Sequence, residues 1–162
     1  MKFNFKSIFS TKKESNNSIV DNDAEYDKYV DFYYTSLINS IVLFSLSLAQ
    51  LEELIEPTFD PLFELESEID YAFTPVIFET IFRNNKIDIS LKQELQDFKK
   101  QVDDIPVELW EWKLLSSHQV WSDIRKNAGL LLDKLGVVNR KYNTKYLTIY
   151  DTEGNVVLKK EK

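Results

Sequence analysis

The sequence predicts a mainly α-helical fold: a helical bundle of two long and several short helices that ends in a β-hairpin. Apolar residues recur every three or four positions over long stretches, as they do on one face of an amphipathic helix. The 162 residues include only 3 Gly and 4 Pro, too few for a turn-rich all-β fold. With 11 Phe, 8 Tyr and 3 Trp, a single domain of this length can bury a sizeable core.

The first 21 residues are predicted to form a flexible arm ahead of the domain, which we place at 22–162. Residues 1–13 carry four lysines and no acid, and the polar stretch TKKESNNS covers residues 11–18. The arm contains no apolar segment long enough for a secretory signal.

The first long helix is predicted over residues 23–56, where Pro57 ends it. Its apolar stripe consists of Tyr26, Val30, Tyr33, Leu37, Ile41, Phe44, Leu48, Leu51 and Ile55. The run 32–51 contains no charge and is as long as a membrane span. Its serine, threonine, asparagine and glutamine side chains favour burial within protein instead.

Shorter helices are predicted to begin at Asp60-Pro61 and Thr74-Pro75, each an N-cap followed by proline, and at a cap on Ser90. The second long helix should run from Pro106 to Gly136, with Trp110, Leu114 and Trp121 on its buried face. Residues 145–160 are predicted to form the hairpin, with its turn at 151–154.

Catalytic and cofactor motifs are missing from the sequence. The chain has no cysteine and a single histidine, His118, which excludes disulfides and thiol catalysis and leaves few metal or general-base schemes. No glycine-rich phosphate loop or nucleophile elbow occurs. We therefore expect a protein that is no enzyme and uses no cofactor or metal. Two alternatives stay open: a carboxylate-dependent enzyme or metal-binding helical protein, and a membrane-associated helical protein.

The charge is distributed unevenly, and this indicates the kind of partner. Residues 14–70 hold fourteen acids and one lysine. Such a surface repels nucleic acid and favours a basic protein partner, although acidic surfaces also serve solubility alone. The candidate partner-binding residues are Asp27, Asp31, Tyr34, Glu52, Glu53, Glu56, Glu64 and Glu68.

The acids from Asp21 to Asp31 and from Glu52 to Asp70, the small size, the missing catalytic motif and the opening MKFNFKSIF resemble small acidic immunity proteins, which neutralise bacterial toxins. The resemblance implies a cytoplasmic bacterial protein that blocks a basic toxin domain such as a nuclease. That class is diverse in fold, so the resemblance implies no architecture and assigns no residue a role.

Overall fold

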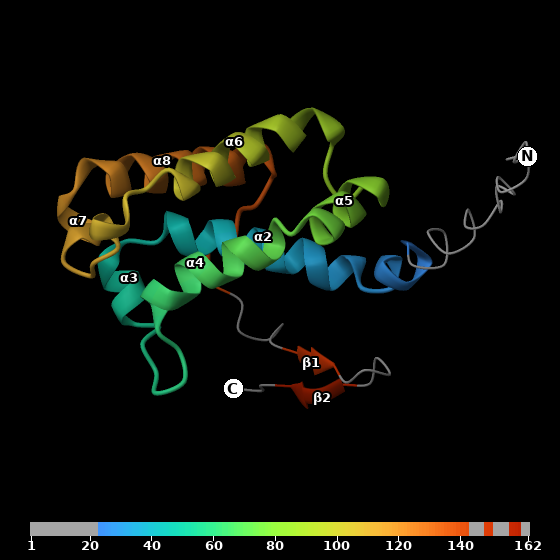
Figure 1. Ribbon diagram of the computed structural model, residues 1–162, viewed down its shortest axis with the longest axis horizontal. Coiled ribbons are helices and arrows are strands. Elements are labelled where there is room, and N and C mark those ends of the chain that lie inside the picture. The colour runs from blue at the N-terminus through green and yellow to red at the C-terminus, as the bar shows by residue number, and fades with distance from the viewer. Residues whose placement is uncertain (1–22, 143–147, 151–155, 160–162) are drawn as a thin grey trace, which may run out of the picture.

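A computed structural model describes residues 23–142, 148–150 and 156–159, and this part of the chain is mainly an α-helical bundle (Figure 1). Residues 23–27 are helical ahead of α2. The further elements are α2 (Val30–Ser45), α3 (Leu48–Glu52), α4 (Pro61–Ala72), α5 (Pro75–Arg83), the 3₁₀ turn η1 (Ile89–Leu91), α6 (Lys92–Asp103), the 3₁₀ turn η2 (Val107–Leu109), α7 (Leu114–Ser117), α8 (Gln119–Lys134) and the strands β1 (Thr148–Tyr150) and β2 (Val156–Lys159).

Helix α2 is the centre of the bundle. It packs against α8, α4 and α5, while α6 packs against α8 (Figure 1). The helices supply a continuous apolar core whose most buried side chains include Leu37, Ile41, Leu65, Ile69, Ile81, Leu95 and Leu132. Among the described residues, no helix is long and apolar enough to cross a membrane. The uncharged run is therefore accounted for by its central place in the bundle.

The two proline-led helices begin where the sequence predicts. The Asp60 side chain accepts a hydrogen bond from the Leu62 backbone N–H at 3.0 Å, and Pro61 is the first residue of α4. Pro75 likewise opens α5, although Thr74 makes no side-chain cap. The predicted cap at Ser90 is wrong: Asp88 caps η1 by accepting from the Ser90 N–H, and α6 begins two residues later.

The first long helix, predicted over 23–56, is interrupted, so its predicted extent is wrong. Leu46 is extended, with ψ of 146°, and Ser47 begins α3 with a capping box that it shares with Gln50. A capping box satisfies the free N–H groups of a new helix start, which makes the break favourable. Ile55 therefore lies beyond the helix and is 55% exposed.

The second long helix, predicted over 106–136, is wrong in the same way. His118 is extended and caps α8, because its Nδ1 accepts a hydrogen bond from the Val120 N–H at 3.2 Å. The break shifts the buried face. Trp121 is buried as predicted, whereas Trp110 is only half-buried and Leu115 replaces Leu114 in the core.

Gly136 follows the end of α8, as the sequence predicts. It has φ of 71°, and the N–H groups of Gly136 and Val137 donate to the carbonyls of Asp133 and Leu132. These two bonds form a Schellman motif, which satisfies the last carbonyls of the helix.

Strands β1 and β2 pair antiparallel, with Ile149 opposite Leu158. The predicted turn at 151–154 and the arm at 1–21 lie outside the described residues. The hairpin over the whole of 145–160 therefore remains a prediction.

Candidate protein-interaction surface

The structure separates the predicted partner-binding acids into two groups, and the first is used within the fold. Arg83 Nη2 lies 2.6 Å from Asp27 Oδ1, and Lys86 Nζ lies 2.5 Å from Asp31 Oδ1. Hydrogen bonds from Arg83 and Asn84 lower the pKa of Asp27 below its ordinary value. These contacts tie the start of α2 and the helical segment before it to the end of α5 and the turn that follows, so both acids have an internal role.

Tyr34 is half-buried and packs against the hydrophobic core. This side chain therefore has a packing role within the fold, and only part of it is exposed to contact a partner.

The second group of acids lies at the other end of α2. Glu52 and Glu53 are exposed on α3, and neither forms an ion pair with the residues that the structure describes. Glu56 is half-buried in the loop that follows, where its backbone pairs with that of Phe59. Glu64 begins the next stretch of acids on α4 and accepts a hydrogen bond from Ser67.

Glu68 faces the C-terminal part of the chain. Its carboxyl accepts a hydrogen bond from the Tyr142 hydroxyl, and the Tyr142 ring lies 5.3 Å from that of Phe59. Burial raises the pKa of Glu68 to about 7, against the opposing effect of the Tyr142 hydrogen bond. Glu68 therefore has a structural partner, whereas Glu52 and Glu53 have no ion-pair partner among the described residues.

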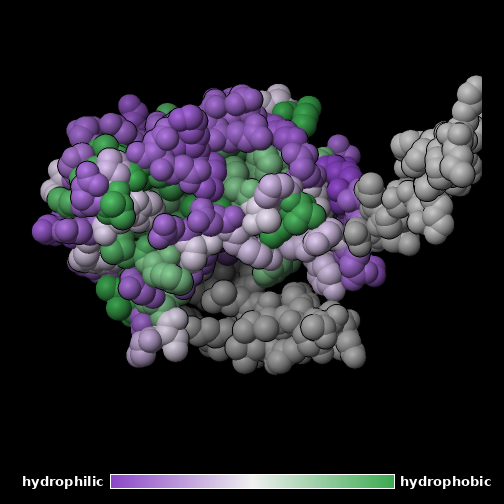
Figure 2. All heavy atoms as spheres, in the orientation of Figure 1, coloured by the Kyte–Doolittle hydropathy of each residue, from purple (hydrophilic) through white to green (hydrophobic). Residues whose placement is uncertain are grey.

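Two exposed apolar side chains lie among the second group of acids. Ile55, in the loop after α3, is 55% exposed, and Phe63, in the first turn of α4, is 64% exposed. We call this region the α3–α4 corner; it comprises Glu52, Glu53, Ile55, Asp60, Phe63, Glu64 and Glu66. Figure 2 shows green apolar side chains at this end of the molecule, set among purple hydrophilic ones. Exposed apolar groups within a charged rim are typical of protein-binding surfaces.

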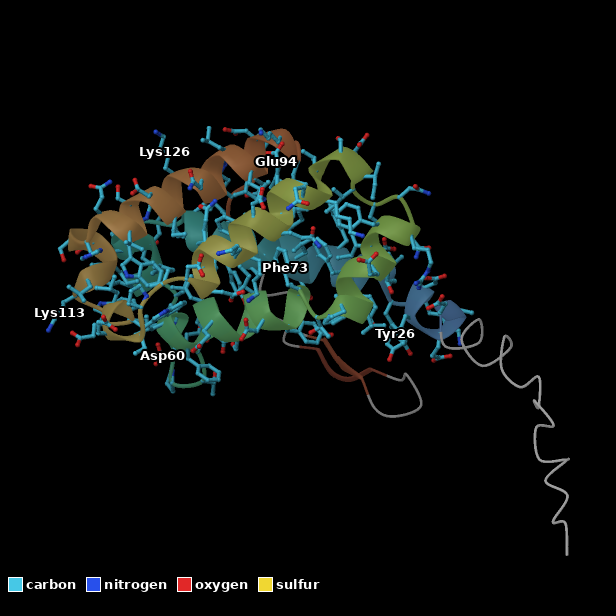
Figure 3. The ribbon with its side chains drawn as sticks, turned by 45° about the horizontal axis from the view of Figure 1, so that its top comes forward. Tyr26, Asp60, Phe73, Glu94, Lys113 and Lys126 are labelled. Atoms are coloured by element: carbon cyan, nitrogen blue, oxygen red, sulfur yellow. The ribbon has the colours of Figure 1, made fainter. Side chains whose placement is uncertain are left out.

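Beside this corner, a hollow between α4 and α6 has a volume of about 220 Å³. Pockets that bind small molecules usually measure about 300–1,000 Å³, so this hollow is of a size to hold a single side chain. Lys99 of α6 crosses toward α4, where its Nζ lies 2.9 Å from Asp70 Oδ1, and it also pairs with Asp103. We call this space the α4–α6 hollow. It is lined by Glu66, Ile69, Asp70, Val102, Asp103, Ile105, Val107 and Trp110. Figure 3 shows α4 and α6 along the same side, with Asp60 and Lys113 at one end of the bundle.

Two other hollows lie further along α6 and are wider. One of 350 Å³ has Phe73, Pro75 and Phe78 beside Lys99 and Lys100, and one of 310 Å³ lies between α6 and α8 beside Leu130. The Lys134–Glu94 ion pair, at 2.5 Å, spans the second. Both are open. The charged residues of the first are all paired, and in the second Glu94 pairs with Lys134 while Asp97 accepts a hydrogen bond from Gln93.

Within residues 23–142 and the two strands, no three His, Cys, Asp or Glu residues are grouped so that they could hold a metal ion. His118 caps α8 through Nδ1, which gives the single histidine a structural task.

Comparison with known proteins gives no relative: no protein-family model, no curated protein and no solved structure matches this chain. The geometry of the surface therefore carries the functional argument.

Sequence reasoning did not select Ile55, Phe63, Glu66 or Trp110 as site residues. For Phe63 a signal existed, because it falls outside the apolar stripe of Leu62, Leu65, Ile69 and Phe73 that the sequence shows for α4. An aromatic residue outside the buried stripe of a helix is a candidate for an exposed contact.

Proposed function

We propose that this chain is a protein-binding protein that engages a basic partner through the α3–α4 corner. The observation that carries the proposal is the distribution of ion pairs. Asp27 and Asp31 are neutralised within the fold, whereas Glu52 and Glu53 remain exposed and unpaired with the described residues, just before the exposed Ile55 in the sequence.

This combination suits rapid and specific association. Unpaired carboxylates at the rim attract a positive surface and raise the association rate. Apolar side chains such as Ile55 and Phe63 gain free energy when a partner removes them from water, so they set how long the complex lasts. The corner therefore has both a steering part and an anchoring part.

The resemblance to small acidic immunity proteins suggests the partner's class. A toxin domain that cleaves nucleic acid needs a basic substrate groove, because it binds phosphates. An acidic protein lying across that groove would exclude the substrate by steric and electrostatic blockade. We accordingly propose that the chain acts as an immunity protein inside a bacterial cytoplasm, without catalytic activity of its own.

The experiment isolates a partner by affinity capture and then measures its binding kinetics with the purified proteins. The variant E52K/E53K should slow association by roughly tenfold at low salt, with a smaller effect at 1 M salt, where the Debye length is about 3 Å. Phe63→Ala should mainly speed dissociation.

The matched control is D97K/D123K, which makes the same change in net charge. Asp97 and Asp123 are exposed on α6 and α8 and contact only the glutamines Gln93 and Gln119 within the hydrogen bonds described. If the control slows association as much as E52K/E53K does, the effect comes from overall charge and the corner is not the binding surface.

One observation favours a second candidate, the carboxylate-dependent enzyme. Glu68 has a pKa of about 7 because it is buried, and carboxyl groups that exchange protons near neutral pH serve as general acids and bases. Against it, Glu68 lines none of the three hollows described above. A paired structural carboxyl also shows such a shift. If the parent chain shows a hydrolase activity and the folded variant Glu68→Gln has lost it, the result would support the carboxylate-dependent enzyme.

A further inference from the structure

The α4–α6 hollow combines an apolar floor with an acidic rim. Apolar side chains line its inner part: Ile69 is fully buried, and Val102 and Ile105 are nearly so. Val107, which is 84% exposed, lies at its outer edge. Such a surface can cover the aliphatic part of a long side chain.

Trp110 forms one wall of the hollow, and its ring packs against a second tryptophan. Its centroid lies 4.9 Å from that of Trp121, with the two rings perpendicular. Trp121 is buried, and its Nε1–H donates to the Leu109 carbonyl at 2.9 Å, which fixes the backbone beside Trp110. The wall is therefore rigid before any ligand arrives, so little conformational entropy is lost on binding.

The rim of the hollow carries an excess of negative charge. Three carboxylates, on Glu66, Asp70 and Asp103, surround it, and the ammonium of Lys99 pairs with the last two. Glu66 is exposed and forms no ion pair with the described residues. A cation that enters the hollow can therefore reach carboxylate oxygens that Lys99 alone does not neutralise.

We infer that this hollow is a binding site for an arginine side chain, supplied by the basic partner. Arginine fits each part of the site: its methylene groups cover the floor, its planar guanidinium packs on the aromatic wall, and its N–H groups donate to the carboxylates. A lysine ammonium matches the charge but not the flat wall. This inference rests on the proposed function, since it supplies the partner with an anchor point beside the α3–α4 corner.

The test uses N-acetyl-L-argininamide as the probe on the full chain, so it needs no identified partner. The indole N–H signals of the three tryptophans are followed by NMR, with Trp110→Phe and Trp112→Phe variants assigning them. We expect the probe to shift the Trp110 signal in a saturable manner. N-acetyl-L-citrullinamide, which has nearly the same shape and no charge, should not.

Glu66→Gln should weaken binding of the arginine probe by roughly threefold to tenfold, because it removes one charge-assisted contact at an exposed site. The matched control is Glu108→Gln. Glu108 is exposed in η2, next to Val107, but does not line the hollow. The Glu108→Gln variant should therefore bind the arginine probe as tightly as the parent chain does.

Three results would overturn the inference: no saturable shift of the Trp110 signal, an equal response to citrulline, or equal losses in Glu66→Gln and Glu108→Gln. Stronger binding of N-acetyl-L-lysinamide would also contradict the choice of arginine. None of these results bears on E52K/E53K and the partner's association rate, so failure of the hollow and failure of the proposed function are distinguishable.

Discussion

Arg125 connects the two breaks in the predicted long helices, and its removal should destabilise the fold. Its Nε donates to the Leu46 carbonyl at 2.7 Å and its Nη2 to the Leu115 carbonyl at 3.0 Å. Leu46 follows α2 and Leu115 lies in α7. Both carbonyls belong to buried residues, so water cannot readily replace the guanidinium.

The expected loss in Arg125→Met follows from these two hydrogen bonds. Bonds from a charged donor are worth about 1.5 kcal/mol each at the lower end of the measured range, or about 3 kcal/mol together. Burial also lowers the pKa of Arg125, because the partly buried guanidinium has lost part of its hydration, and removing the charge recovers part of that cost. Methionine keeps much of the apolar stem. The net loss is therefore about 2 kcal/mol.

Urea unfolding followed by tryptophan fluorescence measures this loss. With a typical slope of about 2 kcal/mol per M, the midpoint should fall by about 1 M. Arg125→Lys should be intermediate, because an ammonium cannot reach both carbonyls with the geometry of the guanidinium fork. Lys126→Met, on the exposed neighbour in α8, should stay within about 0.5 kcal/mol. An unchanged midpoint in Arg125→Met would refute the reasoning.

Further predictions concern pH, the core and the end of α8. Because burial raises the pKa of Glu68 from 4.5 to about 7, the folded state retains a proton that the unfolded chain releases. The contribution of Glu68 to the free energy of unfolding is fully present below pH 4.5 and is lost as pH rises through about 7. After allowance for solvent screening this is about 1–2 kcal/mol, and unfolding of Glu68→Gln should lack this decline; a parallel pH profile would contradict the assignment. Trp121→Ala should lower the free energy of unfolding by about 3–5 kcal/mol. It should also shift or broaden the Trp110 indole N–H signal in NMR spectra, so an unchanged signal would argue against the packing of the two rings. Gly136→Ala, at φ of 71°, should lower stability by about 1 kcal/mol in thermal melts, and a rise would show that the backbone there relaxes at no cost.

The parts of the fold that were predicted correctly depend on local chemistry. Asp60-Pro61 and Thr74-Pro75 fix helix starts through two adjacent residues, and Gly136 fixes an end. These signals lie within one turn of the element that they bound, so a single sequence contains them.

The breaks at Leu46–Ser47 and His118 were missed for a different reason. The apolar stripe continues through both, so periodicity alone extends the helix. Ser47 and Gln50 do show the spacing of a capping box, which was a usable signal. Nothing local indicates that Arg125 will hold both breaks from 79 and 10 residues away.

The acidic surface was predicted in outline, but not which acids compose it. The charge count correctly identifies the first half of the chain as acidic. It cannot show that Arg83 will pair with Asp27, 56 residues earlier, or that Lys99 will cross from α6 to Asp70. Pairing depends on which helices become neighbours, and that information exists only in the folded chain.

Helices α3 and α7 contain five and four residues, fewer than an isolated helix needs to persist in water. Their amide hydrogens should therefore exchange with solvent through local opening, well before those of α2 and α8. Since Arg125 donates to the carbonyl that precedes α3 and to one within α7, we expect the two segments to open as one cooperative unit. The α3–α4 corner includes Glu52, the last residue of α3, so a partner bound at the corner should slow amide exchange in α7 as well, at residues that the partner does not touch.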